Sequence, residues 1–326
     1  MGTPHAYFQR KFVPLAEAKI GVMTHAFNYG TAVFEGIRGN WNGDDEQIYV
    51  FRLEDHFRRM RKNCRILKLD FPHTDEELAD MTVRLVAMCG YNEDIYLRPI
   101  AYKSSEVLGV RLHNVDSDFL IYVTPFGAYL DIDKGARCCT STWRRVEDTA
   151  IPARAKINGL YVNSSLAKTE AVENGFDEAI MLNEDGHVSE GSGENIFIVE
   201  NGRLITPAAY SNILVGITRD TVITLARDEL GVETVERPID RSELYVADEC
   251  FMTGTAAHVT PVTEVDRRPV GEGGLGPITA EIQRLYFEVV RGKNAKYVHW
   301  CTPSYLPSGA ARPAGPRPTQ VPKVKA

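Results

Sequence analysis

The chain has 326 residues, of which 44% are hydrophobic and 25% are charged, a balance typical of a soluble globular protein. Its formal net charge of −7 gives nucleic acid no general electrostatic reason to bind. No apolar run approaches the length of a membrane-spanning helix, and the N-terminal residues lack the apolar core of a signal peptide. The six cysteines include no C-x-x-C pair, which favours free thiols over a zinc site. We therefore expect a soluble cytoplasmic protein that binds neither nucleic acid nor membrane.

Extended apolar segments and helical patterns follow one another along the chain. Strands are predicted at Gln47–Leu53, Ile95–Ala101, Phe119–Thr124, Glu178–Leu182, Asn195–Val199 and Glu249–Thr253. Helices are predicted at Glu54–Leu69, Asp75–Gly90, Leu160–Asn174, Ile217–Leu230 and Pro277–Arg291. This mixture indicates an α/β or α+β fold.

The length exceeds the usual size of one compact core, so two domains are expected. The segment Pro125–Gly135 is rich in turn formers and is interpreted as the connection. We expect a small N-terminal α/β domain at 1–125, a linker at 126–135 and a large C-terminal domain at 136–302. The sequence after Cys301 holds six prolines and no acidic residue, which predicts a disordered Pro-rich tail at 303–326.

Two turns built from glycine and threonine favour a phosphorylated ligand. Gly216–Asp220 (GITRD) opens a predicted helix, whose first N–H groups have no intrahelical partner and, with the Thr218 hydroxyl, can hold a phosphate. Phe251–Ala257 (FMTGTAA) follows a short apolar strand and presents a second group of donors. Gly271–Gly276 (GEGGLG) follows no buried strand, so we interpret it as a turn and not as a dinucleotide-binding motif.

Three charged residues are candidates for chemistry. On the predicted helix Glu54–Leu69 one side gathers the basic residues Arg58, Arg61, Lys62 and Arg65. Arg59 lies apart from them and is expected to point toward a specific partner such as an anion. Lys156 lies among small and apolar residues, where partial desolvation favours a neutral, nucleophilic amine. Considered alone, such a lysine is usually solvated, and Glu190 in its Gly/Ser-rich turn is usually an ordinary turn carboxylate.

Five segments, in this order, resemble the signature of branched-chain amino-acid aminotransferases, which are fold type IV pyridoxal-phosphate enzymes. They are Asn28–Arg38 (NYGTAVFEGIR), Ala155–Ser164 (AKINGLYVNS), Glu190–Asn195 (EGSGEN), Gly216–Asp220 (GITRD) and Gly254–Ala257 (GTAA). The resemblance extends from about Ala6 to Gly292. It implies a two-domain enzyme with its active site between the domains and pyridoxal 5'-phosphate as cofactor.

The resemblance also implies a role for each matching residue at the cofactor. Lys156 matches the lysine that forms the Schiff base and moves the proton between substrate and cofactor. Glu190 matches the carboxylate that faces the pyridine nitrogen and keeps it protonated, and Tyr161 matches the tyrosine beside the ring oxygen. The residues that match the family's phosphate site are Arg59, Ile217, Thr218 and Thr255.

The implied reaction transfers the amino group of leucine, isoleucine or valine to 2-oxoglutarate, giving branched-chain 2-oxo acids and L-glutamate. The backbone amides of Ala256 and Ala257, with Tyr96, match the group that holds the α-carboxylate. Arg98 matches the arginine that meets the γ-carboxylate of glutamate. The other residues expected around the substrate are Tyr29, Phe34, Tyr129 and Tyr161 in an aromatic wall, Arg38 near the entrance, and Phe126.

Two features bear on specificity and assembly. Phe126 stands in the linker where bacterial relatives often carry tryptophan, so the pocket loses an indole and its N–H donor. Leu108–Val110 resembles the loop that reaches into the neighbouring subunit's pocket, which implies a homodimer or a higher homo-oligomer.

Several alternatives remain open or are disfavoured. D-amino-acid aminotransferases and (R)-selective amine transaminases share the fold, but the former usually carry a Tyr-Gly-Asp-Gly pattern and an Arg-x-His pair. This chain has Tyr29-Gly-Thr-Ala and Arg98-Pro-Ile instead, and side activity toward (R)-amines stays open. The string Phe34–Arg38 (FEGIR) argues against a 4-amino-4-deoxychorismate lyase. An interaction protein that uses the Pro-rich tail would be colourless even with pyridoxal phosphate.

Overall fold

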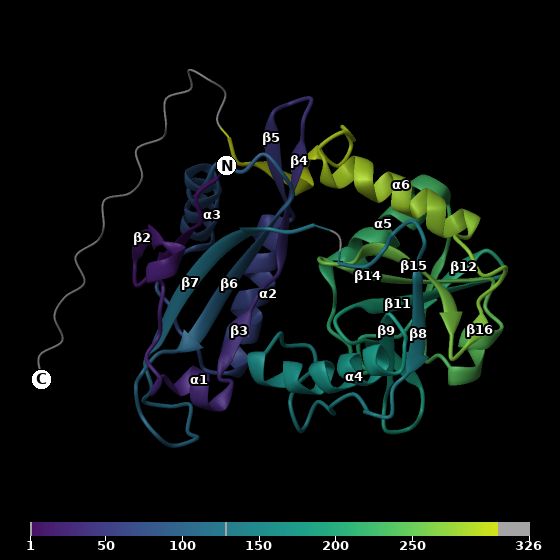
Figure 1. The fold of residues 1–326 in the computed structure, drawn as a ribbon, viewed down its shortest axis with the longest axis horizontal. Coiled ribbons are helices and arrows are strands. Elements are labelled where there is room, and N and C mark those ends of the chain that lie inside the picture. The colour runs from purple at the N-terminus through teal and green to yellow at the C-terminus, as the bar shows by residue number, and fades with distance from the viewer. Residues whose placement is uncertain (1, 128, 306–326) are drawn as a thin grey trace, which may run out of the picture.

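The computed structural model describes residues 2–127 and 129–305, which form two β-sheets that lie side by side (Figure 1). The N-terminal part of the chain builds most of the first sheet, and the C-terminal part builds the second. Short 3-10 turns connect some of the elements, at Leu15–Glu17, Asn158–Leu160, Arg241–Tyr245 and Val298–Trp300.

The first sheet is antiparallel and has the order β17-β5-β4-β6-β7-β1-β2, with β3 also paired to β6. Its strands are β1 (His5–Phe8), β2 (Lys11–Pro14), β3 (Ala32–Phe34), β4 (Ile37–Asn42), β5 (Gln47–Phe51), β6 (Ile95–Lys103), β7 (Ser117–Pro125) and β17 (Cys301–Pro303). Its helices are α1 (His25–Tyr29), α2 (Leu53–Ile66) and α3 (Asp75–Cys89).

Helix α2 is buried along two neighbouring stripes. Leu53, Phe57 and Met60 recur at helical spacing and enter the core of the first sheet, each no more than 1% exposed. His56 and Arg59 follow a second stripe, about 100° around the helix from the first. The second stripe is therefore free to face polar groups outside the apolar core.

The second sheet is mixed, with the order β10-β9-β8-β15-β14-β11-β12-β13 and β16 paired to β15. Its strands are β8 (Ala136–Thr140), β9 (Glu178–Leu182), β10 (Val188–Gly191), β11 (Asn195–Glu200), β12 (Arg203–Thr206), β13 (Thr234–Glu236), β14 (Glu249–Gly254), β15 (His258–Val265) and β16 (Arg268–Pro269). Helices α5 (Ile217–Leu230) and α6 (Pro277–Val290) cover one side, and α4 (Tyr161–Glu173) packs against β9 on the other (Figure 1).

The segment around Lys156 belongs to the C-terminal part of the chain but is bonded to the first sheet. The N–H of Phe34 in β3 donates to the Lys156 carbonyl at 3.0 Å, and the N–H of Gly159 donates to the Gly30 carbonyl at 3.2 Å. A Cβ on Gly30, whose φ is 65°, would lie 2.7 Å from the Gly159 Cα, so a side chain does not fit there. These contacts fix the lysine at the junction of the two halves.

Residues 301–305 differ from the expectation of a domain boundary at 302 and a disordered tail from 303. Cys301–Pro303 pairs with β5 and forms the edge of the first sheet, and the Tyr305 hydroxyl donates to the Tyr91 carbonyl at 2.6 Å. The reason is that β5 offers an unpaired edge, and the Gln47 side chain accepts the N–H groups that follow β17. The remaining residues of the predicted tail, 306–326, lie outside the described residues.

Every predicted helix and strand overlaps an observed one, and two match residue for residue, Glu178–Leu182 and Ile217–Leu230. The predicted strand Gln47–Leu53 is too long, because Arg52 adopts a left-handed φ of 49° and α2 begins at Leu53. Within the described ranges, no helix combines the length and the hydrophobicity needed to cross a membrane.

Candidate active site

A cavity of about 550 Å³ lies between the two halves of the chain, within the usual size of a small-molecule site. Thirteen of the sixteen expected site residues line it: Phe34, Arg59, Tyr96, Arg98, Phe126, Tyr129, Lys156, Tyr161, Glu190, Ile217, Thr218, Thr255 and Ala256. The fold thus brings together residues that are far apart in the sequence. Tyr29, Arg38 and Ala257 are not among the lining residues.

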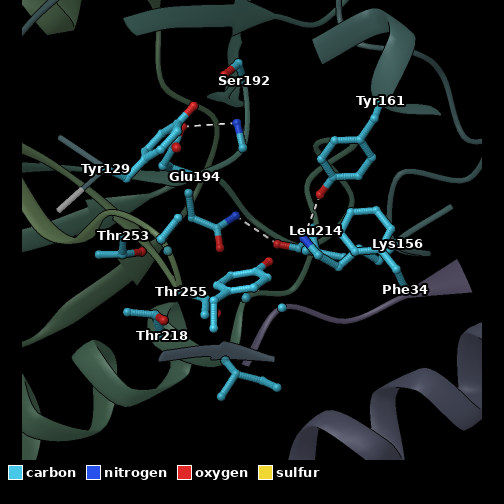
Figure 2. Close-up of a pocket in the computed structure, with 18 of the residues that line it drawn as sticks. Phe34, Tyr129, Lys156, Tyr161, Ser192, Glu194, Leu214, Thr218, Thr253 and Thr255 are labelled. Carbon is cyan, nitrogen blue, oxygen red and sulfur yellow. Dashed lines mark hydrogen bonds between the residues drawn. The ribbon is translucent and has the colours of Figure 1, made fainter. Parts of the chain in front are cut away.

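Lys156 presents its amine to the cavity (Figure 2). Its Nζ donates a hydrogen bond of 2.6 Å to the Tyr161 hydroxyl and lies 4.9 Å from the centroid of the Phe34 ring. The neighbours Ala155 and Ile157 are buried, at 0% and 5% exposure, so the short loop has little freedom to turn the lysine away. The amine therefore has one fixed polar partner and an aromatic wall.

Glu190 is a buried carboxylate with three donors around it. Its Oε2 accepts from the Asn195 side chain and from the Leu214 N–H, each at 3.0 Å, and its Oε1 lies 2.6 Å from the Arg145 guanidinium. Burial raises the pKa of Glu190 above its ordinary value, although Arg145, the Leu214 N–H and Lys156 oppose that shift. The carboxylate is held in one orientation at the cavity wall.

Arg59 enters the cavity from α2 and is fixed by Glu35. Its Nε and one terminal nitrogen donate to the two oxygens of Glu35 at 2.8 and 2.6 Å, a bidentate pair, and Nη1 donates to the Val215 carbonyl at 3.0 Å. Glu35 is completely buried and also bonds His56 Nδ1 at 2.8 Å. Burial opposes its ionisation, but Arg59 and His56 outweigh that effect and hold the pKa of Glu35 at about 2.

The N-terminus of α5 opens beside Arg59. Gly216 is the N-cap, and within the described chain no side chain caps it by a hydrogen bond, so the first N–H groups of the helix stay available. A Cβ on Gly216 would lie 2.1 Å from Asn195 Oδ1, so only glycine allows this approach. Thr218 and Thr255 add hydroxyls to the same part of the lining (Figure 2). The helix dipole, the amides, the hydroxyls and Arg59 together suit a dianionic phosphate.

The opposite part of the cavity carries a second arginine and a set of aromatic rings. Arg98 donates to the Tyr96 hydroxyl at 3.0 Å, and its guanidinium lies 4.3 Å from the Phe34 ring centroid. Its Nε is buried and, among the described residues, has no hydrogen-bond partner. Gly36 leaves room for Tyr96, because a Cβ there would lie 2.0 Å from the phenol oxygen. Arg98 thus has an unused donor beside the cavity.

Arg38 differs from the expectation that it lies near the entrance and meets substrate. It is 3% exposed, and its guanidinium donates to main-chain carbonyls of the linker, at Phe126 and Gly127, and of the turn after β14, at Thr255 and Ala256. The physical reason is burial, since an enclosed guanidinium requires acceptors and these carbonyls supply them.

The same contacts orient the turn after β14. In a trans peptide the N–H points away from the C=O, and the described chain contains no cis peptide. Because Arg38 binds the carbonyls of Thr255 and Ala256, the N–H groups of Ala256 and Ala257 point in the opposite direction. Arg38 therefore orients the two expected carboxylate donors, while its own guanidinium is bonded to main-chain carbonyls.

Tyr29 and Ala257 also differ from their expected place in the cavity wall. The Tyr29 hydroxyl accepts the Gly109 N–H at 3.0 Å, a hydrogen bond that ties α1 to the loop after β6. Within α1, the centroids of the Tyr29 and His25 rings lie 4.7 Å apart. Ala257 is 1% exposed and does not line the cavity.

Several lining residues were missed by sequence reasoning. Arg145 had no motif around it, and Asn195 and Glu194 stood inside EGSGEN without an assigned role. Burial and the neighbouring Glu178 raise the pKa of Glu194 to about 8, and Glu194 lines the cavity together with Tyr129 and Ser192 (Figure 2). In residues 2–127 and 129–305, no group of three or more His, Cys, Asp or Glu side chains is arranged so that it could hold a metal ion.

The comparisons with known proteins agree with this arrangement. The model of the family "Amino-transferase class IV" matches residues 32–265, so the chain belongs to that family. It is 52% identical over 300 residues to a probable branched-chain-amino-acid aminotransferase of Aquifex aeolicus, covering 92% of this chain and 96% of that one.

Solved structures are similar throughout the fold. A branched-chain aminotransferase from Thermoproteus uzoniensis with norvaline has a TM-score of 0.89 and 46% identity, covering 93% of this chain and all of that one. A branched-chain amino acid aminotransferase from Thermobaculum terrenum in its PLP-form has a TM-score of 0.88 and 39% identity, covering 94% of this chain and all of that one. These values place the chain among fold type IV aminotransferases.

Proposed function

We propose that this chain is a pyridoxal-phosphate-dependent aminotransferase that transfers the amino group of branched-chain L-amino acids to 2-oxoglutarate. One observation carries the proposal: the amine of Lys156 lies in a cavity whose wall also holds Arg59 and Glu190. Those are the three groups that the cofactor requires, namely an amine for its aldehyde, a cation for its phosphate and an anion for its ring nitrogen. The similarity to an enzyme solved in its PLP-form supports it.

The residues present fit the cofactor at each of its polar groups. The phosphate would be held by the Arg59 guanidinium, the first amides of α5 and the hydroxyls of Thr218 and Thr255. Glu190 would accept the ring N–H, and Tyr161 would donate to the ring oxygen. When bound, pyridoxal phosphate accepts the electron pair released at the substrate Cα.

The chain's own groups then divide the chemistry between them. The Lys156 amine would take the proton from the substrate Cα, and the Tyr161 hydroxyl, which accepts a hydrogen bond from that amine at 2.6 Å, would orient it. Glu190, as a carboxylate, would keep a proton on the ring nitrogen. The amides of Ala256 and Ala257 hold the α-carboxylate in the orientation that Arg38 imposes on their peptides.

Substrate choice follows from the lining of the same cavity. Phe34, Phe126 and Tyr129 offer apolar surface for isobutyl, sec-butyl and isopropyl groups, where each buried methylene contributes about 0.8 kcal/mol. Arg98, whose guanidinium lines the cavity, would receive the γ-carboxylate of 2-oxoglutarate or glutamate. One cavity can therefore serve an apolar side chain and a carboxylate in turn.

We further propose a homodimer, in which α1 and the loop after β6 meet a second copy of the chain. His25 Nε2 lies 2.8 Å from the Gly109 carbonyl, so the two segments form one surface. That surface exposes large apolar side chains, with Phe27 at 67%, Leu108 at 72% and Val110 at 80%. Exposed apolar groups gathered in this way mark an interface.

The free thiols of all six cysteines fit a reducing, cytoplasmic location.

The cofactor is tested by adding pyridoxal phosphate to the full-length protein and recording the visible absorption spectrum. The wild type should develop a yellow band, and borohydride should remove it by reducing the imine to a stable secondary amine that keeps the cofactor on the lysine. Lys156→Ala should bind the cofactor reversibly and lose turnover by about 10²–10⁴-fold or more, whereas Lys134→Ala, at a side chain 87% exposed, should match the wild type. A colourless wild type, or full activity in Lys156→Ala, would refute the proposal.

The substrate is tested with a panel of amino donors and 2-oxoglutarate. Leucine, isoleucine and valine should exceed D-alanine and an (R)-arylamine. If D-alanine or the arylamine reacts faster, the alternative with D-amino-acid or (R)-amine specificity replaces the branched-chain assignment.

A further inference from the structure

Arg145 is a buried cation in the cavity wall, and the roles described above do not use it. Its Nη2 lies 2.6 Å from Glu190 Oε1, and both side chains are about 5% exposed. The backbone N–H of Arg145 donates to the Leu182 carbonyl at 2.9 Å, which anchors the residue to β9. Longer contacts of 3.4 Å join its other nitrogens to Ser164 Oγ and the Asn212 carbonyl. The guanidinium is thus fixed from several elements with its strongest bond directed at Glu190.

The two carboxylate oxygens of Glu190 have different partners. Oε2 accepts from Asn195 and from the Leu214 N–H, and Oε1 accepts from Arg145. Among these three partners Arg145 is the one that carries a full charge. Neutral donors can orient a carboxylate, but a cation at 2.6 Å also opposes its protonation.

The effect of Arg145 on the protonation of Glu190 matters because Glu190 is buried in the cavity wall. Burial raises the pKa of Glu190, and Arg145 is the first of the groups that act against burial. A carboxylic acid in this position would present no charge to a ring nitrogen, and the cofactor's proton would then reside on the protein. The carboxylate must stay ionised for the proton to remain on the ring.

We propose that Arg145 is a positioning residue for transamination: its guanidinium fixes Oε1 of Glu190 and keeps that carboxylate ionised toward the ring nitrogen of the bound cofactor. The inference rests on the proposed function for its second half, the cofactor. Its first half, the ionisation of Glu190, concerns the protein alone and can be measured separately.

The first measurement follows the infrared band of protonated carboxyl groups in the full-length protein, across pH, before any cofactor is added. Arg145→Gln should move one carboxyl group to a higher pH of protonation than in the wild type. Arg145→Lys, which keeps the charge, should restore much of the wild-type behaviour. In the double variant Arg145→Gln/Glu190→Gln the shifted band should be missing, which identifies it as Glu190.

The second measurement uses the protein loaded with pyridoxal phosphate. Arg145→Gln should lower kcat roughly 10–100-fold, a usual cost of losing a group that supports a working residue, and should move the acid limb of the pH profile upward. In the Glu190→Gln background the same change should have little further effect, because Arg145 acts through Glu190. Arg237→Gln is the matched control, since Arg237 pairs with Glu243 at 2.6 Å away from the cavity.

Two results would overturn the inference. Equal protonation of Glu190 in the wild type and in Arg145→Gln would show that the arginine does not control its charge. An undiminished loss of kcat in the Glu190→Gln background would show that Arg145 acts directly on the ligand. Failure of the wild type to bind pyridoxal phosphate would refute the proposed function but leave the infrared result standing, so the two failures are distinguishable.

Discussion

Two arginine–glutamate pairs lie in different parts of the cavity wall, and their members exchange roles. In the pair from the first half, Arg59 faces the expected phosphate and Glu35 supports it from behind. In the pair from the second half, Glu190 faces the expected ring nitrogen and Arg145 supports it. Both pairs are closed by a contact of 2.6 Å. The same pair of side chains can therefore present either a cation or an anion.

The two carboxylates differ in how completely they are paired. Glu35 receives two bonds from Arg59 and one from His56, and these interactions hold its pKa at about 2 despite burial. Glu190 receives one contact from an arginine and two neutral donors, and burial raises its pKa. Glu35 is thus a permanent structural anion, whereas Glu190 depends on its partners for its charge.

Removal of Glu35 should break the first pair with the largest effect on stability. Glu35→Leu leaves the guanidinium of Arg59 without its buried counterion, and breaking such a pair costs about 3–5 kcal/mol. Urea unfolding of the cofactor-free protein measures this loss. Glu243→Gln, which breaks a more exposed pair with Arg237, should cost about 1 kcal/mol or less. Equal losses in the two variants would contradict the distinction between a buried pair and a surface one.

The acid stability of the protein should depend on the same carboxylate. Because the pKa of Glu35 is lowered on folding from 4.5 to about 2, its contribution is complete above pH 4.5 and is lost as the pH falls toward 2. The free energy of unfolding should therefore fall more steeply over this range in the wild type than in Glu35→Leu. Parallel curves for the two proteins would show that other groups govern the acid limb.

The motifs predicted the working member of each pair but not the supporting one. Arg59 was found by its angular position and by its family match, and Glu190 by its string EGSGEN. Glu35 stood inside the quoted string FEGIR, where a carboxylate among apolar strand residues was a usable signal of a buried partner. Arg145 had no such signal, because its link to Glu190 depends on how β9 and β10 bring the two segments together.

Arg38 illustrates a different limit of the sequence. A resemblance assigns a residue to a site, but it does not tell which of its atoms meet the ligand and which meet the protein. The fold directs the Arg38 guanidinium to carbonyls of the linker and of the turn after β14, contacts between segments that no local pattern specifies. Helices and strands were easier to predict from the sequence, because the periodicity of apolar residues along the chain indicates which face is buried.

A conservative change at Arg59 should separate binding from stability. Arg59→Lys keeps the charge beside Glu35 but removes the planar fork that can serve Glu35 and a phosphate together. We expect the dissociation constant for pyridoxal phosphate to rise about 10–100-fold, with a much smaller loss of stability than in Glu35→Leu. Fluorescence or absorbance titration of the cofactor-free protein gives the constant. Unchanged affinity would remove Arg59 from the proposed phosphate site.

Glu194 is a third buried carboxyl group in the cavity wall, and the nearby cation, Lys168, is paired with another carboxylate. Lys168 lies 2.6 Å from Glu178, and Glu194 accepts the N–H of Gly193 at 3.0 Å. Burial and Glu178 raise the pKa of Glu194 to about 8, so its folded form stays protonated at neutral pH.

The variant Glu194→Gln should therefore have the smallest effect, because an amide resembles the protonated acid in size and polarity. Near pH 7 its kcat/KM should lie within about twofold of the wild type. In the wild type, folding stability declines as the pH rises from 4.5 toward 8, since the unfolded chain releases this proton first. The glutamine variant should lack that contribution and lose less stability between about pH 4.5 and 8. A large loss of activity at pH 7 would instead mean that Glu194 acts as an anion, in the manner of Glu190.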